Sequence, residues 1–180
     1  MKNNCLLFMA FLALFMSGCK KNPEIGEASC SYVVCSYTID AVDIALFFEL
    51  HPSSGEAYVV TPWEYYYYEY HDYNNFTLSI PSHIYYNDQN YTVTRIGRKA
   101  FYDIGLSTLI IPYTVVRIEN DAFGGSNIPN LICMATTPPS IERSSFDHAS
   151  LQSIYVPNES VNMYKYEFGW QQYAGIIVGY

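Results

Sequence analysis

Basic side chains are scarce in this 180-residue chain, which contains nine Lys and Arg residues against 17 Asp and Glu residues. No group of neighbouring Lys and Arg residues is longer than two. A nucleic-acid-binding surface needs enough cations to replace the counterions of the phosphate backbone, and this composition does not supply them. We therefore expect no nucleic acid among the partners and no electrostatic attachment to an anionic lipid surface.

Motifs of catalysis are missing as well. The sequence contains no phosphate-binding loop, dinucleotide fingerprint or zinc-protease helix. Its four histidines lie in or beside polar or turn-like stretches, outside any known catalytic motif. No cysteine pair has zinc-site spacing, whereas Cys30 and Cys35 are placed to close a small disulfide loop in an exported protein, with free thiols as the alternative. We expect the protein to have no enzymatic activity, no cofactor and no metal site.

Long apolar runs are absent except near the N-terminus, where Leu6–Met16 spans 11 residues. That run is too short to cross about 30 Å of hydrocarbon and has the length of a signal-peptide core. Ser17-Gly18-Cys19 follows and resembles a bacterial lipobox, which implies cleavage before Cys19 and its lipidation. The alternative is an ordinary secretory signal cleaved nearby. We expect residues 1–18 to be a lipoprotein signal peptide and the lipid anchor to hold the protein on a membrane.

The chain does contain a repeat, which becomes visible when Phe101, Phe123 and Phe146 are aligned. The spacings are 22 and 23 residues, within the range of stacked structural repeats. Six columns, the Phe column included, agree in three copies. The other five lie at −5 (Ile96, Ile118, Ile141), −1 (Ala100, Ala122, Ser145), +5 (Leu106, Ile128, Leu151), +8 (Leu109, Leu131, Ile154) and +10 (Ile111, Cys133, Val156).

The columns at +8 and +10 predict short strands with one buried face, because their apolar residues alternate with an intervening residue. One copy cannot bury its apolar residues alone. Copies stacked at about 4.8 Å would join these strands into a parallel sheet over a continuous core, which is a solenoid. Cys133 falls between Ile111 and Val156 in its column, so we interpret it as a small buried hydrophobe.

At this point the residues resemble a known family. The stretches "IPYTVVRIENDAF", "RIGRKAF" and "LSTLIIP" are similar to the BspA-like leucine-rich repeat, whose pattern is I-P-x-x-V-x-x-I-x-x-x-A-F. The resemblance covers residues 95–157 and implies a bacterial cell-surface or secreted protein, often adhesive, without catalytic residues. The sequence departs from the pattern at Ser145, where Ala is usual, and at "LICMATTP".

Outside the repeats, turn residues predict two hairpins, one around "HPSSG" (51–55) and one around Asn87–Asn90. Val161, Tyr164 and Phe168 recur at helical spacing and predict a short helix. The expected fold is mainly β with little helix: a short leucine-rich-repeat solenoid with an N-terminal β-hairpin cap and a C-terminal helical cap. The predicted parts are the signal peptide (1–18), a lipidated tether (19–36), the N-terminal β cap (37–94), the repeats (95–157) and the C-terminal cap (158–180).

Two surfaces are candidates for binding. The stretch "WEYYYYEYHDYNNF" contains Trp63, Tyr66 and Tyr68, whose rings suit glycan stacking or protein recognition. Inward packing of alternate tyrosines in a hairpin is the other interpretation. In the repeats, Ile110, Ile132 and Tyr155 lie between the inward residues and would align on the outer sheet face, either as an interface or covered by another segment.

These features together predict a non-enzymatic protein of the bacterial cell envelope, lipid-anchored, on the outer membrane and exposed at the cell surface. Its expected role is protein binding or adhesion. Two alternatives stay open: carbohydrate binding through the tyrosine-rich stretch, and a structural role in the envelope without an external ligand.

Overall fold

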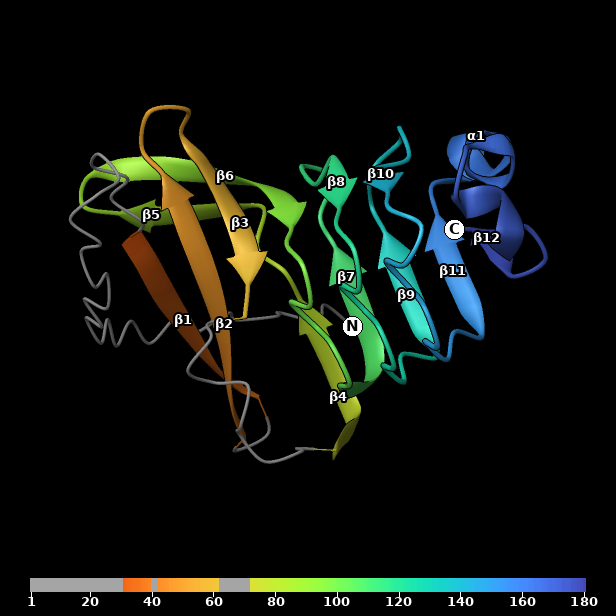
Figure 1. Cartoon of the computed structure of the whole chain (residues 1–180), viewed down its shortest axis with the longest axis horizontal. Helices are drawn as coiled ribbons and strands as arrows, with labels where there is room; N and C mark the ends of the chain where they lie inside the picture. The colour runs from red at the N-terminus through yellow and green to blue at the C-terminus, as the bar shows by residue number, and fades with distance from the viewer. Residues whose placement is uncertain (1–30, 40–41, 62–71) are drawn as a thin grey trace, which may run out of the picture.

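In a computed structural model of the protein, residues 31–39, 42–61 and 72–180 are described, and they form two β-sheets and one short α-helix (Figure 1). The fold is mainly β, as predicted. Side chains are described from Leu46 to Thr61 and from Phe76 onward. Within these residues no helix is long and apolar enough to cross a membrane.

The first sheet is parallel throughout and contains the predicted repeat strands. Its order is β12-β11-β9-β7-β4, and Leu109 pairs with Leu131, which aligns with Ile154. The predicted columns therefore lie in register. A further strand lies on each side of the three copies, with Leu78 opposite Leu109 and Ile177 opposite Ile154. The bounds are β4 (Asp72–Ser79), β7 (Gly105–Ile111), β9 (Asn130–Cys133), β11 (Ser153–Val156) and β12 (Ile177–Gly179).

The second sheet joins the hairpins to the repeats. Its order is β1-β2-β3-β6-β8-β10, with β5 on the side of β6. The strands β1, β2 and β3 are antiparallel, whereas β3 pairs with β6 in parallel and the repeat strands β8 and β10 follow in parallel. The bounds are β1 (Ser31–Ile39), β2 (Val42–His51), β3 (Glu56–Val60), β5 (His83–Tyr86), β6 (Gln89–Ile96), β8 (Arg117–Ile118) and β10 (Ser140–Ile141).

Both predicted hairpins are present. The first joins β2 to β3 through the turn after His51. The second joins β5 to β6 through Asn87 and Asp88, whose φ angles are 47° and 59°. Two central residues with positive φ are what a two-residue type I′ turn requires, and Asn and Asp tolerate that conformation better than most residues. The local sequence therefore determines this hairpin.

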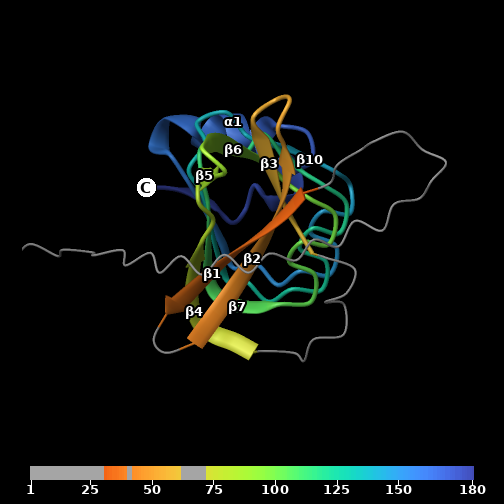
Figure 2. The ribbon, with the colours of Figure 1, turned by 90° about the vertical axis from the view of Figure 1, so that its left-hand side faces the viewer.

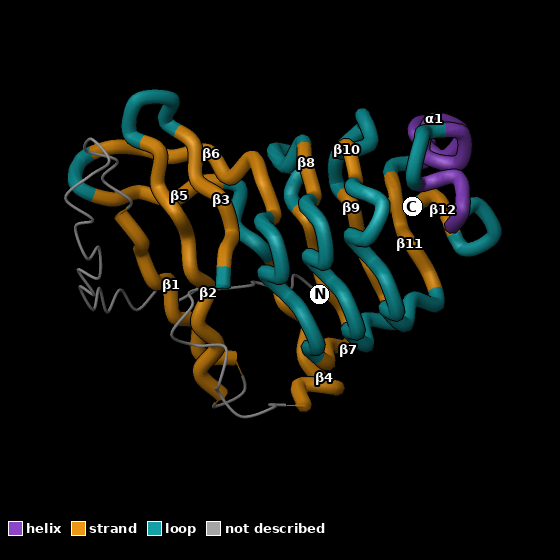
Figure 3. The backbone as a smooth tube through the Cα atoms, viewed as in Figure 1, coloured by secondary structure: helices purple, strands orange, loops and turns teal. Residues whose placement is uncertain are grey.

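The core between the sheets is built on the Phe column. Phe101 and Phe123 stack with ring centroids 5.5 Å apart, and Phe123 and Phe146 with centroids 4.9 Å apart. The next ring in the column is Trp170, whose centroid is 5.8 Å from that of Phe146. The chain returns between repeats through loops that lie side by side (Figure 3). The column therefore turns four separate coils into one continuous core.

A left-handed residue two positions after each Phe closes the coil. Asp103, Gly125 and His148 have φ angles of 59°, 71° and 60°. The neighbouring backbones are then close enough to bond, as in the 2.8 Å hydrogen bond that the Phe123 N–H donates to the Ser145 carbonyl. Asp, Gly and His are residue types that populate this region more readily than most. Apolar columns do not reveal this feature of the repeat.

The predicted helix is shorter than its periodicity suggested. The helix α1 spans Val161–Tyr166, and the chain is already extended at Glu167. Phe168 is 79% exposed, so its inclusion in the helical face was wrong, and the fully buried Trp170 packs inward instead. The glycine between them, Gly169, has a φ of 86° that reverses the chain and ends any helical phase. Short 3-10 turns flank α1 at Asn158–Ser160 and Trp170–Tyr173.

Two buried hydrogen bonds attach this C-terminal segment to the loop after β9. The Tyr164 hydroxyl donates to the Ala135 carbonyl at 2.9 Å, and the Trp170 indole N–H donates to the Pro139 carbonyl at 2.7 Å. Both side chains are fully buried, and burial raises the pKa of the Tyr164 hydroxyl. The C-terminal segment thus supplies hydrogen-bond donors to the Ala135 and Pro139 carbonyls, which lie in a loop between strands.

Removing the Tyr164 hydroxyl is expected to destabilise the protein modestly. A Tyr164→Phe variant leaves the Ala135 carbonyl without this donor in a dry environment, which costs about 1–3 kcal/mol. The measurement is urea denaturation against the unchanged protein. A matched control is Tyr166→Phe, because Tyr166 is 83% exposed and no stability change is expected there. An equal effect at both positions would contradict the bond's contribution.

Cys133 is a buried free thiol, and its burial agrees with its position between Ile111 and Val156 in the +10 column. Its side chain is 1% exposed, and burial strongly raises the pKa of the thiol. Since the thiolate is the reactive form, we expect the native protein to resist alkylation at this position. Peptide mass mapping after iodoacetamide treatment should find Cys133 unmodified in buffer and modified in denaturant. Rapid modification under native conditions would show that this part of the core opens.

Candidate binding surfaces

The outer face of the first sheet presents a continuous row of side chains. Ile110 pairs with Ile132, which pairs with Tyr155, so the three predicted residues lie side by side. Register extends the row to Ser79 on β4 and to Val178 on β12. The three central side chains are half-buried, and Val178 is 46% exposed. At about 4.8 Å per strand, the five positions span about 19 Å.

Polar residues flank this row on the same face. Thr108, Asn130 and Ser153 are aligned in the register position two residues earlier. Hydrogen bonds fix the backbone around them, because the Asn130 side-chain amide donates to the Ser107 carbonyl at 3.0 Å. The Ser107 hydroxyl in turn donates to the Phe76 carbonyl at 2.7 Å. An apolar row beside polar groups on a rigid sheet is an arrangement that suits protein recognition.

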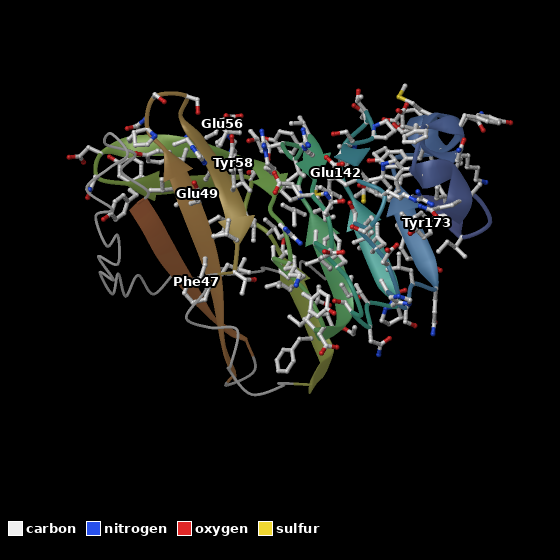
Figure 4. The ribbon with its side chains drawn as sticks, in the orientation of Figure 1. Phe47, Glu49, Glu56, Tyr58, Glu142 and Tyr173 are labelled. Carbon is white, nitrogen blue, oxygen red and sulfur yellow. The ribbon has the colours of Figure 1, made fainter. Side chains whose placement is uncertain are left out.

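The outer face of the second sheet has a different character, because its charges neutralise one another. Arg95 contacts Glu119 at 3.2 Å, and Arg117 forms the same pair with Glu142 one repeat further on. The Arg95 guanidinium also lies 4.3 Å from the centre of the Tyr58 ring. Figure 4 labels Tyr58 on β3 and Glu142 directly after β10. Each Arg thus bridges to the acid of the following repeat.

Titratable groups at the hairpin end of this face are held by their neighbours. The Thr94 hydroxyl donates to Glu56 at 3.0 Å and lowers the pKa of that carboxyl, whereas burial raises the pKa of Tyr58. Because the folded-state pKa of Glu56 is lowered, its contribution to stability is present above the unfolded-state pKa and is lost as the pH falls. These side chains already have partners, so the face offers few groups to a ligand.

A groove opens along the edge where the first sheet ends. It has a volume of about 550 Å³, and Tyr113, Val116, Met134 and Pro138 are among the residues that line it. Its lining includes the departure from the repeat pattern at "LICMATTPPS", where six residues connect β9 to β10, whereas five connect β7 to β8. The longer of the two loops also contains the Pro138-Pro139 pair. The departure was visible in the sequence, but the groove was not.

Several predicted positions lie outside the described part of the chain. Cys19, Cys30, Trp63, Tyr66 and Tyr68 are among them, so lipidation, the disulfide and the tyrosine-rich surface stay predictions. Cys35 lies in β1 opposite Leu46, and its side chain is not described. Within the described residues, no group of three His, Cys, Asp or Glu side chains is placed to hold a metal ion.

Comparison with known protein families finds a match in the repeat region. Residues 94–177 match the family model of the BspA type leucine rich repeat region, which describes six copies of the repeat. A solved leucine-rich repeat protein from Bacteroides capillosus is 16% identical, with a TM-score of 0.41, and the match covers 68% of this chain and 99% of that chain. A search of the curated proteins found no match. Residues 94–177 of this protein are therefore similar to BspA type leucine-rich repeats, a repeat class associated in general with protein binding or adhesion.

Proposed function

We propose that this protein is a non-enzymatic lipoprotein of the bacterial cell envelope that binds a protein partner. In this proposal, lipidated Cys19 holds it on the outer membrane, exposed at the cell surface. The repeats form a short solenoid, with the hairpins β1 to β3 and β5–β6 as an N-terminal cap and the segment around α1 as a C-terminal cap. Neither nucleic acid nor a cofactor takes part.

The row Ser79, Ile110, Ile132, Tyr155 and Val178 carries the proposal. It is continuous across five strands, whereas on the other sheet Arg95, Arg117 and their acidic partners neutralise one another. A rigid parallel sheet fixes the spacing of the row, so a partner finds its contact surface already formed and little side-chain entropy is lost on binding. The repeat resemblance of residues 94–177 supports the same role.

The test is a binding screen with a triple variant, Ile110→Lys, Ile132→Glu and Tyr155→Lys. Opposite charges on adjacent strands should preserve the sheet while placing charge across the row. The chain from residue 20 onward would be screened against arrays of extracellular-matrix proteins and of glycans. We expect protein binding that falls at least tenfold in the triple variant, because a partner must then remove three charges from water to cover the row.

The matched control is Tyr85→Lys, since Tyr85 is 59% exposed on the β5–β6 hairpin and lies away from the row. This control is expected to bind like the unchanged protein. Equal protein binding by all three proteins would contradict the placement of the site. Glycan binding that is unchanged in the triple variant would support the carbohydrate alternative.

A further inference from the structure

Exposed large apolar side chains concentrate on the segments that follow strands β7, β9 and β11 of the first sheet, helix α1 included. Ten such side chains are exposed among the described residues, and six of them follow β7, β9 or β11. The six are Tyr113 (60% exposed), Val116 (62%), Met134 (43%), Met163 (50%), Tyr166 (83%) and Phe168 (79%). Of the other four, Tyr180 follows β12 at the same end of the first sheet, whereas Tyr85, Tyr102 and Val178 lie elsewhere.

These six residues belong to one edge of the molecule. The strands β7, β9 and β11 are adjacent and parallel, so the loops at their C-terminal ends must lie along the same edge. Figure 1 and Figure 2 both place α1 and β10 on this side. We call residues 112–116, 134–139 and 157–168 the apolar edge. It includes the groove of about 550 Å³.

The charge of the apolar edge indicates what it contacts. Residues 112–116 and 134–139 contain no charged side chain, and 157–168 contain only Glu159, Lys165 and Glu167. Exposed Tyr, Phe and Met side chains on loops and a short helix, without a basic patch, are suited to the boundary between lipid headgroups and acyl chains. They are not suited to electrostatic attraction by anionic lipids, which requires Lys and Arg.

The place where the chain enters the fold also favours contact between the apolar edge and the membrane. The strand β1 begins at Ser31, which pairs with Leu50 next to the C-terminal end of β2, and β2 points in the same direction as β7, β9 and β11 (Figure 1). The 12 residues from Cys19 to Cys30 reach at most about 40 Å. A lipid on Cys19 therefore keeps the bilayer within reach of this side of the molecule.

We infer that the apolar edge lies in the surface of the membrane to which the lipid anchor holds the protein. This inference rests on the lipid anchor of the proposed function and adds the orientation of the protein. The edge is formed by the ends of the strands, so both sheet faces then stand away from the bilayer. The row from Ser79 to Val178 stays accessible to a protein partner.

Quenching of tryptophan fluorescence by brominated lipid tests the orientation. The lipidated protein, which begins at Cys19, would carry either Tyr166→Trp or Tyr85→Trp and would be reconstituted in phosphatidylcholine vesicles with brominated acyl chains. Both native tyrosines are exposed, and only Tyr166 lies on the apolar edge. After subtraction of the signal from the unchanged protein, we expect at least twofold stronger quenching for the variant at position 166. The difference should persist at high salt, because screening does not weaken an apolar contact.

Each other outcome has a definite meaning. If the protein floats with the vesicles, equal quenching at the two positions, or no quenching at either, would overturn the inference. A difference that disappears at high salt would also overturn it, because the contact would then be electrostatic. Failure of the protein to float with the vesicles would instead contradict the lipid anchor. Adding Phe168→Asp to the Tyr166→Trp variant should reduce the quenching without releasing the protein.

Discussion

Replacing Phe123 with Ala is expected to lower the free energy of unfolding by about 3–5 kcal/mol, the range for truncating a buried Phe. The Phe123 side chain is fully buried and stacks on Phe101 and on Phe146 at 5.5 Å and 4.9 Å between ring centroids. Its removal leaves a cavity in the middle repeat and interrupts the only ring column joining the first repeat to the last within the described core. Urea denaturation followed by circular dichroism measures the change.

The control for this effect is Tyr113→Ala, which removes an aromatic side chain of comparable size that is 60% exposed. Surface truncations of this kind change stability by about 0.5 kcal/mol or less. Should the Phe123→Ala variant be too unstable to purify, Phe123→Leu preserves part of the volume and should show a smaller loss in the same direction. Equal stability of Phe123→Ala and the unchanged protein would contradict the Phe column as the basis of the core.

Replacing Gly169 with Ala is expected to lower the free energy of unfolding by about 2–5 kcal/mol, from backbone strain and overpacking together. Gly169 has a φ of 86°, a conformation that residues with a Cβ rarely adopt. An added Cβ would also lie 2.5 Å from the Cγ1 atom of Ile141, which is far closer than a van der Waals contact. We therefore expect the substitution to displace Trp170 from the end of the Phe column.

Gly175→Ala is the matched control, because an added Cβ there meets no atom within 4 Å. Its stability should stay the same or rise slightly, since Ala restricts the unfolded chain more than Gly does. Near-ultraviolet circular dichroism would report whether Trp170 keeps its packing in the two variants. If both glycine variants unfold at the same urea concentration as the unchanged protein, the tight turn at Gly169 makes no contribution to stability.

Much of the repeat region could be predicted because its information is local. The alternation of Leu109 and Ile111 identifies one buried face of a strand, and repetition every 22 or 23 residues identifies the stack. The hairpin at Asn87 and Asp88 was predictable for the same reason, since two adjacent residues determine the turn. Periodicity failed at Phe168, because the helix ends at Tyr166 and the chain is extended at Glu167, and the turn at Gly169 then places Trp170 inward.

The candidate binding surfaces could likewise be predicted from the sequence only in part. The row of Ile110, Ile132 and Tyr155 followed from the strand period, and its extension to Ser79 and Val178 required the pairing of β4 and β12, which lie outside the three aligned copies. The parallel pairing of β3 with β6 and the Arg95–Glu119 pair depend on contacts between segments 24 or more residues apart. No local pattern encodes such contacts.

By itself, the sequence determined the repeat length, the residues that point into the core and the turns whose backbone conformation a few residue types tolerate. Only the tertiary structure decided which surfaces remain available. The Arg and Glu side chains of successive repeats neutralise one another, and a groove lies between the connections that carry Tyr113 and Met134. The physical reason is that burial inside one repeat follows from its own side-chain pattern, whereas the exposed groups depend on how closely neighbouring coils approach.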